Sequence, residues 1–129
     1  MTKPAISKAA QAAACQDDDP GYTLRALPSV RARLVAAGAS TGGPEALLSF
    51  LHGLGRPNAP VLVAMHMGEA FADILVSLVA RQAGLPAQIA REGERLESGV
   101  VYFAPGGQHL QVEANCMGLV ARLEAASPD

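Results

Sequence analysis

A serine in a run of small residues is the strongest sign of chemistry in this sequence. Residues 38–44 read GASTGGP, and Gly38, Ser40 and Gly42 have the spacing of a nucleophile elbow. Small residues suit a sharp, strained turn that projects the serine hydroxyl beyond the edge of a sheet. The N-terminus of a following helix would offer free backbone N–H groups and a positive dipole to a developing oxyanion. The pattern predicts that Ser40 is a nucleophile.

Three other uses of this glycine-rich turn stay open. A phosphate cradle of the Walker type needs a lysine before the serine or threonine, and none is present. A dinucleotide loop fits the spacing of Gly38 and Gly42, but Pro44 follows and no acidic residue ends the next apolar run to hold a ribose. A purely structural glycine turn is the third use. We favour the nucleophile because we expect a strand before the turn and a helix after it.

His66 is the candidate general base. It directly follows the apolar run 60–65, and neighbouring parallel strands end at the same edge of a sheet, so it should approach Ser40 there. His52 falls at the end of the first expected helix, where an imidazole interacts with the helix dipole. His109 follows a Pro-Gly-Gly turn within reach of the same edge, and we expect a structural role for it.

The sequence offers no convincing carboxylate to orient His66. A histidine base normally works with an acid that holds its ring in the correct tautomer. The acidic residues considered are Glu69, Asp73, Glu92 and Glu94. Glu69 follows His66 too closely to reach the far side of the ring with ease, and Asp73 lies a helical turn later. The order serine, acid, histidine of α/β hydrolases is not met either.

The elements that must position these residues alternate between strands and helices. Continuous apolar runs at residues 34–37 and 60–65 suit strands buried on both faces of a parallel sheet. Between them an apolar face recurs at helical spacing, with Pro44 in its first turn. This face comprises Leu47, Phe50, Leu51 and Leu54. A second helical face comprises Phe71, Ile74, Leu75, Leu78 and Gln82. That helix ends at Gly84 and Pro86.

The remaining segments complete an α/β pattern. Residues 87–90 and 99–105 are short strand candidates, and residues 109–113 and 119–124 flank a turn typical of a terminal hairpin. The expected fold class is therefore α/β, doubly wound, with a mainly parallel sheet and a terminal β-hairpin.

Residues 1–30 differ from the remainder of the chain. They are partly alanine-rich, lack apolar periodicity and include an acidic triplet at residues 17–19. We expect a flexible tail or linker remnant there, followed by one domain over residues 31–129. A metal site at the triplet is the weaker alternative.

Composition excludes several classes of protein. Of the 129 residues, 50% are hydrophobic and 17% are charged, with a formal net charge of -2, which argues against a disordered chain and against nucleic-acid binding. The apolar runs are too short to span a bilayer and no secretory signal is evident, so we expect no membrane insertion. Two cysteines are too few for a disulfide framework, which favours a cytoplasmic protein.

Three segments in order resemble the CheB-type chemotaxis protein-glutamate methylesterases. They are residues 38–47, 61–67 and 101–110, within a resemblance that covers roughly residues 31–124. It implies a doubly wound α/β domain that hydrolyses glutamate γ-methyl esters on methyl-accepting chemotaxis receptors and deamidates certain receptor glutamines. It also implies that no cofactor is needed.

The resemblance carries over to three residues of the first two segments. It implies that Ser40 is the nucleophile, that His66 is the base and that Thr41 acts at the oxyanion side. Met65 stands where the family usually has glutamine. The family continues beyond the equivalent of Asp129 to a segment with its catalytic aspartate, and no match to that segment is found here.

These departures imply a C-terminally incomplete methylesterase domain that is weak or inactive as an enzyme. The alternatives are a non-catalytic binding module in chemotaxis signalling and a truncated gene product with no settled role. A cut sheet exposes an apolar edge, so we also expect self-association through that edge.

Overall fold

The chain divides into two units, Met1–Val30 and Arg31–Asp129. The computed structural model describes residues 23, 25–26 and 31–127, so the tail expected over residues 1–30, with its acidic triplet, lies almost wholly outside the described residues. All elements named below belong to the second unit. Within the described ranges, no helix has the length and apolar character that crossing a membrane requires.

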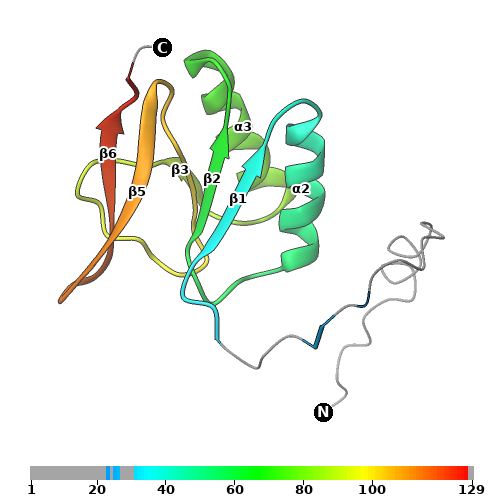
Figure 1. Cartoon of the computed structure of the whole chain (residues 1–129). Helices are drawn as coiled ribbons and strands as arrows, with labels where there is room; N and C mark the ends of the chain where they lie inside the picture. Colours follow the sequence, from blue (N-terminus) through cyan, green and yellow to red (C-terminus); the bar gives the residue numbers. More distant parts are fainter. Residues whose placement is uncertain (1–22, 24, 27–30, 128–129) are drawn as a thin grey trace. The chain divides into compact units, whose positions relative to one another are not determined.

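Four short strands form a parallel sheet. They are β1 (Val35–Ala39), β2 (Val61–Met65), β3 (Ala87–Ile89) and β4 (Val101–Phe103). Their order across the sheet is β1-β2-β4-β3, and every neighbouring pair is parallel. Figure 1 shows β1 and β2 side by side in this sheet. The prediction of an α/β fold with a mainly parallel sheet is confirmed.

Two helices, α2 (Gly43–Leu54) and α3 (Glu69–Gln82), cover one face of this sheet (Figure 1). They pack on side chains that alternate along β2 and β4, as the two-residue period of a strand requires. The core on this face comprises Leu47, Leu51, Val61, Val63, Leu75, Val79, Leu85, Val101 and Phe103.

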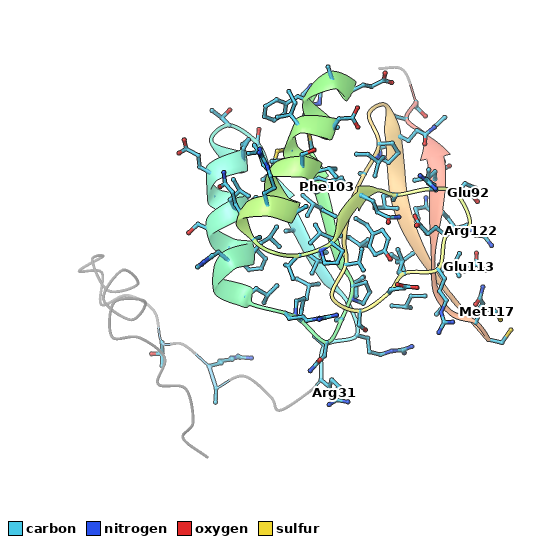
Figure 2. All side chains as sticks on the ribbon, turned by 180° about the vertical axis from the view of Figure 1, so that it is seen from behind. Arg31, Glu92, Phe103, Glu113, Met117 and Arg122 are labelled. Atoms are coloured by element: carbon cyan, nitrogen blue, oxygen red, sulfur yellow. The ribbon has the colours of Figure 1, made fainter. Side chains whose placement is uncertain are left out.

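An antiparallel hairpin of β5 (Gln108–Asn115) and β6 (Gly118–Ala125) covers part of the opposite face. It confirms the predicted terminal hairpin, with both strands longer than expected. Met117 lies at its tip (Figure 2). The core beneath the hairpin comprises Leu62, Ala90, Leu96, Tyr102 and Ala121.

The loop before β4 is tied to the hairpin by backbone and side-chain bonds. The backbone N–H of Leu96 donates to the carbonyl of Leu119 at 2.8 Å. Arg122 on β6 lies between two carboxylates, 3.2 Å from Glu92 of the loop and 2.8 Å from Glu113 of β5 (Figure 2). The hairpin is therefore held to the sheet by polar bonds as well as by apolar burial.

The first strand is not buried on both faces, contrary to the prediction. Along β1 the burial alternates, and Ala36 and Gly38 are exposed. A Cβ added to Gly38 would meet no atom within 4 Å. The reason is position, because β1 is an edge strand and none of its residues belongs to the core beneath the hairpin.

The predicted inner face of the second helix is also wrong in part. Phe71 and Ile74 are 40% and 56% exposed, whereas Ala72, Leu75 and Val79 are buried. Both stripes are apolar at helical spacing, so periodicity alone did not separate them.

Candidate active site

Ser40 begins the turn that joins β1 to α2. The backbone N–H of Gly43 donates to the carbonyl of Ser40 at 2.7 Å, which closes a four-residue turn. Gly42 has φ 73° and ψ 3°, the left-handed conformation that a type II turn requires at its third position. No residue other than glycine has a positive φ in the described chain, so the strained backbone expected at the serine of a nucleophile elbow is not found, and Gly42 adopts the left-handed conformation of this turn at little cost.

Gly43 allows the helix to begin directly against the sheet. A Cβ at this buried position would lie 2.9 Å from the Cβ of Ala39 and 3.1 Å from the Cε of Met65. The first turn of α2 therefore sits immediately beside the carboxyl ends of β1 and β2. Any larger residue at position 43 would push the helix away from them.

The free donors around Ser40 are fewer than a helix N-terminus normally provides. The N–H of Gly43 is used within the turn, Pro44 has none, and the N–H of Ala46 donates to the Gly42 carbonyl at 3.4 Å. The backbone N–H of Thr41, the residue after the serine, makes no backbone hydrogen bond in the described part of the chain. The N–H of Gly42 also makes none, so both groups are free to donate to an oxyanion.

His66 follows β2 as Ser40 follows β1. Ala39 and Met65, the last residues of the two strands, are register partners, and neighbouring strands lie roughly 4.8 Å apart. Ala39 and Met65 both border the Cβ position of Gly43, so both face α2. Strand alternation then directs the next residues, Ser40 and His66, toward the opposite face. Both are exposed, and neither side chain is hydrogen-bonded within the described ranges.

A cavity of about 440 Å³ lies at the carboxyl ends of β2 and β4. Its walls are the end of β2, the turn before β5 and the end of the hairpin. The lining residues are Ala64, Met65, His66, Met67, Ala104, Pro105, Gly106, Gly107, Gln108, His109 and Ala126. The cavity thus includes His66 and His109 but not Ser40, which follows the neighbouring strand. His109, given only a structural role from the sequence, borders the same cavity as His66.

None of the acidic residues considered as partners of His66 lines the cavity that His66 borders. Glu69 and Asp73 line a second cavity of about 290 Å³. Glu92 accepts the backbone N–H of Leu123 at 2.6 Å, and this bond is the main reason that the pKa of Glu92 is lowered, with Arg122 contributing less. Glu94 accepts a bond from the Arg91 backbone at 3.1 Å.

The structure also locates His52 and tests whether residues are grouped to hold a metal ion. His52 lies in the last turn of α2, as expected. Within residues 31–127 and the few described before them, no three of the His, Cys, Asp and Glu side chains are grouped to hold a metal ion. Gln108 lines both cavities, although it is not among the site residues predicted from the sequence. The only signal in the sequence was its place directly after the Pro-Gly-Gly turn.

Comparison with known proteins identifies the family of this chain. The family model described as CheB methylesterase matches residues 35–128. A protein-glutamate methylesterase/protein-glutamine glutaminase of Rhodospirillum rubrum is 34% identical over 110 residues, covering 83% of this chain and 28% of the relative. A relative of the same description from Burkholderia thailandensis is 35% identical over 125 residues, covering 96% of this chain and 35% of the relative.

A solved structure agrees with these relatives. The crystal structure of the Thermotoga maritima CheB methylesterase catalytic domain matches with a TM-score of 0.69 and 31% identity, over 76% of this chain and 52% of that one. The chain thus spans about half of that catalytic domain and about a third or less of the two curated relatives. With the family model matching most of its length, this chain belongs to the CheB methylesterase family.

Proposed function

We propose that this chain carries the nucleophile and the base of a protein-glutamate methylesterase. The observation that carries the proposal is the register pairing of Ala39 with Met65, which supports Ser40 and His66 as neighbours at one edge of the sheet. A serine and a histidine in this relation suit acyl transfer. The names of the relatives, protein-glutamate methylesterase/protein-glutamine glutaminase, agree with that chemistry.

The reaction follows from the roles of these groups. Ser40 Oγ attacks the γ-carbonyl carbon of a glutamate methyl ester while His66 takes the hydroxyl proton. The backbone N–H of Thr41 donates to the developing oxyanion. His66 then returns the proton to the departing oxygen, which leaves as methanol, and an acyl-enzyme remains. Water hydrolyses this ester, with His66 again as base. A glutamine side chain follows the same path and releases ammonia.

Membership of the family supports a proposal for the substrate and for the place where the chain acts. We propose that the substrates are glutamate esters and glutamines on methyl-accepting chemotaxis receptors, and that the chain acts in the cytoplasm as part of chemotaxis signalling. The cavity beside His66 suits such a side chain because most of its lining residues are small or apolar.

We propose slow turnover for this chain alone. Glu69 and Asp73 line the neighbouring cavity rather than that of His66. Loss of the orienting carboxylate from a serine triad costs on the order of 10⁴-fold in turnover, because the base loses its preferred tautomer. The nucleophile and the oxyanion donor would still act, so a residual rate should depend on Ser40.

We also propose self-association through β1. Among the described strands β1 has one paired edge, toward β2. Beside the free edge lies an apolar groove of about 300 Å³. It is lined by Ala36, Ala37, Gly38, Ala39, Ala46, Leu47 and Phe50. An exposed edge of small, uncharged residues lacks the charges that normally prevent pairing between copies.

The test of catalysis is methanol release from a receptor peptide that carries glutamate methyl ester. The wild-type chain should exceed the background rate, and Ser40→Ala and His66→Gln should both return it to background. His52→Gln is the matched control, because His52 lies at the far end of α2 and should leave the rate unchanged. If the wild-type chain and Ser40→Ala give equal rates, the esterase proposal fails and a non-catalytic binding module is favoured.

A further inference from the structure

Two cavities share one wall at the carboxyl edge of the sheet. One, of about 440 Å³, is lined by His66, and the other, of about 290 Å³, is lined by Glu69 and Asp73. Three residues line both cavities: Pro105, Gly106 and Gln108. Gln108 is the one member of this shared wall whose side chain can donate and accept hydrogen bonds.

The turn that carries Gln108 is fixed on both sides. A Cβ added to Gly106 would lie 3.7 Å from the Cγ of Glu69 and 3.8 Å from the carbonyl oxygen of Met67, so this turn packs closely on the start of α3. The backbone N–H of Ala126 donates to the Gly107 carbonyl at 3.0 Å, which ties the turn to the end of the hairpin. The position of Gln108 is therefore set by the fold.

The amide of Gln108 is available to a ligand. Its side chain is exposed and makes no hydrogen bond within the described chain. Strand alternation puts it on the same face of β5 as Leu110, which packs against the core beneath the hairpin. The side chain thus faces the sheet and its cavities rather than the outer surface of the hairpin.

The order of groups along the edge indicates what Gln108 meets. Ser40 follows β1, His66 follows β2, and Gln108 begins the strand that follows β4, in a sheet ordered β1-β2-β4. A base that takes the proton of the nucleophile and returns it to the leaving group lies between the two. The leaving group therefore lies on the side of His66 that is away from Ser40. Gln108 lies on that same side.

We propose that Gln108 is a specificity-determining residue that contacts the leaving group of the substrate side chain. The inference rests on the proposed function. The methoxy group of an ester only accepts hydrogen bonds, whereas the amino group of a glutamine side chain donates them. A primary amide pairs with either group, so Gln108 allows this site to take both an ester and an amide.

The test uses binding to the Ser40→Ala protein, in which hydrolysis does not interfere. Two receptor peptides are compared that differ at one side chain, glutamate methyl ester or glutamine. Gln108→Glu keeps the acceptor and loses the donor, so it should shift the affinity ratio toward the glutamine peptide on the order of tenfold. The two peptides have the same net charge, so the long-range effect of the added charge is the same for both, and the ratio reports the local contact of residue 108 with the leaving group. Gln82→Glu, at the end of α3 and outside both cavities, is the charge-matched control.

The outcomes separate this inference from the proposed function. A ratio that moves with Gln108→Glu and not with Gln82→Glu supports a contact to the leaving group. If both peptides bind and the ratio is the same in all three proteins, the role of Gln108 is overturned while the substrate class stands. If neither peptide binds, the proposed substrate and the role of Gln108 both fail.

Discussion

Along one row of side chains across three neighbouring strands, burial changes from core at one end to solvent exposure at the other. Ala36, Leu62 and Tyr102 are register partners on β1, β2 and β4. Leu62 and Tyr102 are 8% and 2% exposed, whereas Ala36 on the same face is exposed to solvent. The hairpin accounts for the difference, because its core includes Leu62 and Tyr102 and no residue of β1.

This contrast shows how burial depends on elements that are distant in sequence. The runs that form β1 and β2 are both continuous and apolar. β2 is covered by helices on one face and by the hairpin on the other, and the hairpin begins more than forty residues later in the chain. A strand pattern therefore predicts that a segment enters a sheet, while the coverage of each face is decided by the tertiary fold.

The largest expected effect lies in the covered part of this row. Leu62→Ala removes a buried side chain between the sheet and the hairpin and should lower the free energy of unfolding by about 2–5 kcal/mol. Ala36 is the register partner of Leu62 on β1. Ala36→Ser should change the free energy of unfolding by no more than about 0.5 kcal/mol, because the side chain of Ala36 already contacts water. Urea unfolding of both variants measures the difference. Equal losses would show that the two faces are not covered as described.

The uncovered end of this row, at Ala36 on β1, should instead determine how strongly two copies of the chain associate. Ala36→Lys puts a charge on the exposed face of the edge strand, and a symmetric pair of copies would bring two such charges together. We expect self-association to weaken on the order of tenfold, measured by sedimentation velocity. Gln82→Lys adds the same charge at the end of α3 and should have no effect. A wild-type chain that sediments as a monomer would refute association through β1.

Local patterns in the sequence predicted the elements well. The runs before Gly38 and before His66 form neighbouring strands, and the parallel pairing of β1 with β2 could be expected from the intervening helix. The family could be recognised from short segments that lie at strand ends. These features depend on residues close together in the sequence, so they were accessible without the fold.

Features that depend on packing between distant elements were not accessible. The inner stripe of α3 could not be chosen, because Ala72 and Val79 on one side of Leu75 compete with apolar residues on its other side at helical spacing. Gln108 borders two cavities only because the hairpin returns across the ends of β2 and β4. The sequence pattern predicts the hairpin but not its position relative to the ends of these strands.

A smaller effect is expected from the hydroxyl group of Tyr102. Its Oη accepts the backbone N–H of Glu97 at 2.8 Å, and burial raises the pKa of Tyr102 above its usual value of 10.0. Tyr102→Phe should lower the free energy of unfolding by about 1 kcal/mol near neutral pH. Above pH 10 the unfolded chain loses the tyrosine proton first, so wild-type stability falls and the two proteins should converge. A constant difference up to high pH would contradict this assignment.

The smallest effect should come from the carboxylate that holds the hairpin edge, because its partners are exposed and screened by solvent. The pKa of Glu92 is lowered, chiefly by the bond from the Leu123 backbone and less by Arg122. The folded state therefore favours the charged form, and the stabilisation is present above pH 4.5, the usual pKa of a glutamate, and lost as the pH falls through the lowered pKa. Glu92→Gln should lower the urea midpoint slightly near neutral pH, and the difference should vanish in strong acid.

Glu113→Gln is the matched control for this last change, because Glu113 also pairs with Arg122 but accepts no backbone bond from β6 among the described hydrogen bonds. If the backbone bond is the main cause of the lowered pKa, Glu92→Gln should reduce the midpoint more than Glu113→Gln does. About 1 M salt should then shrink the effect of Glu113→Gln more completely, since only an exposed ion pair is lost there. Equal effects of the two variants at every salt concentration would assign the stabilisation to Arg122 alone, and the hairpin would be held at this edge by charge rather than by a backbone bond.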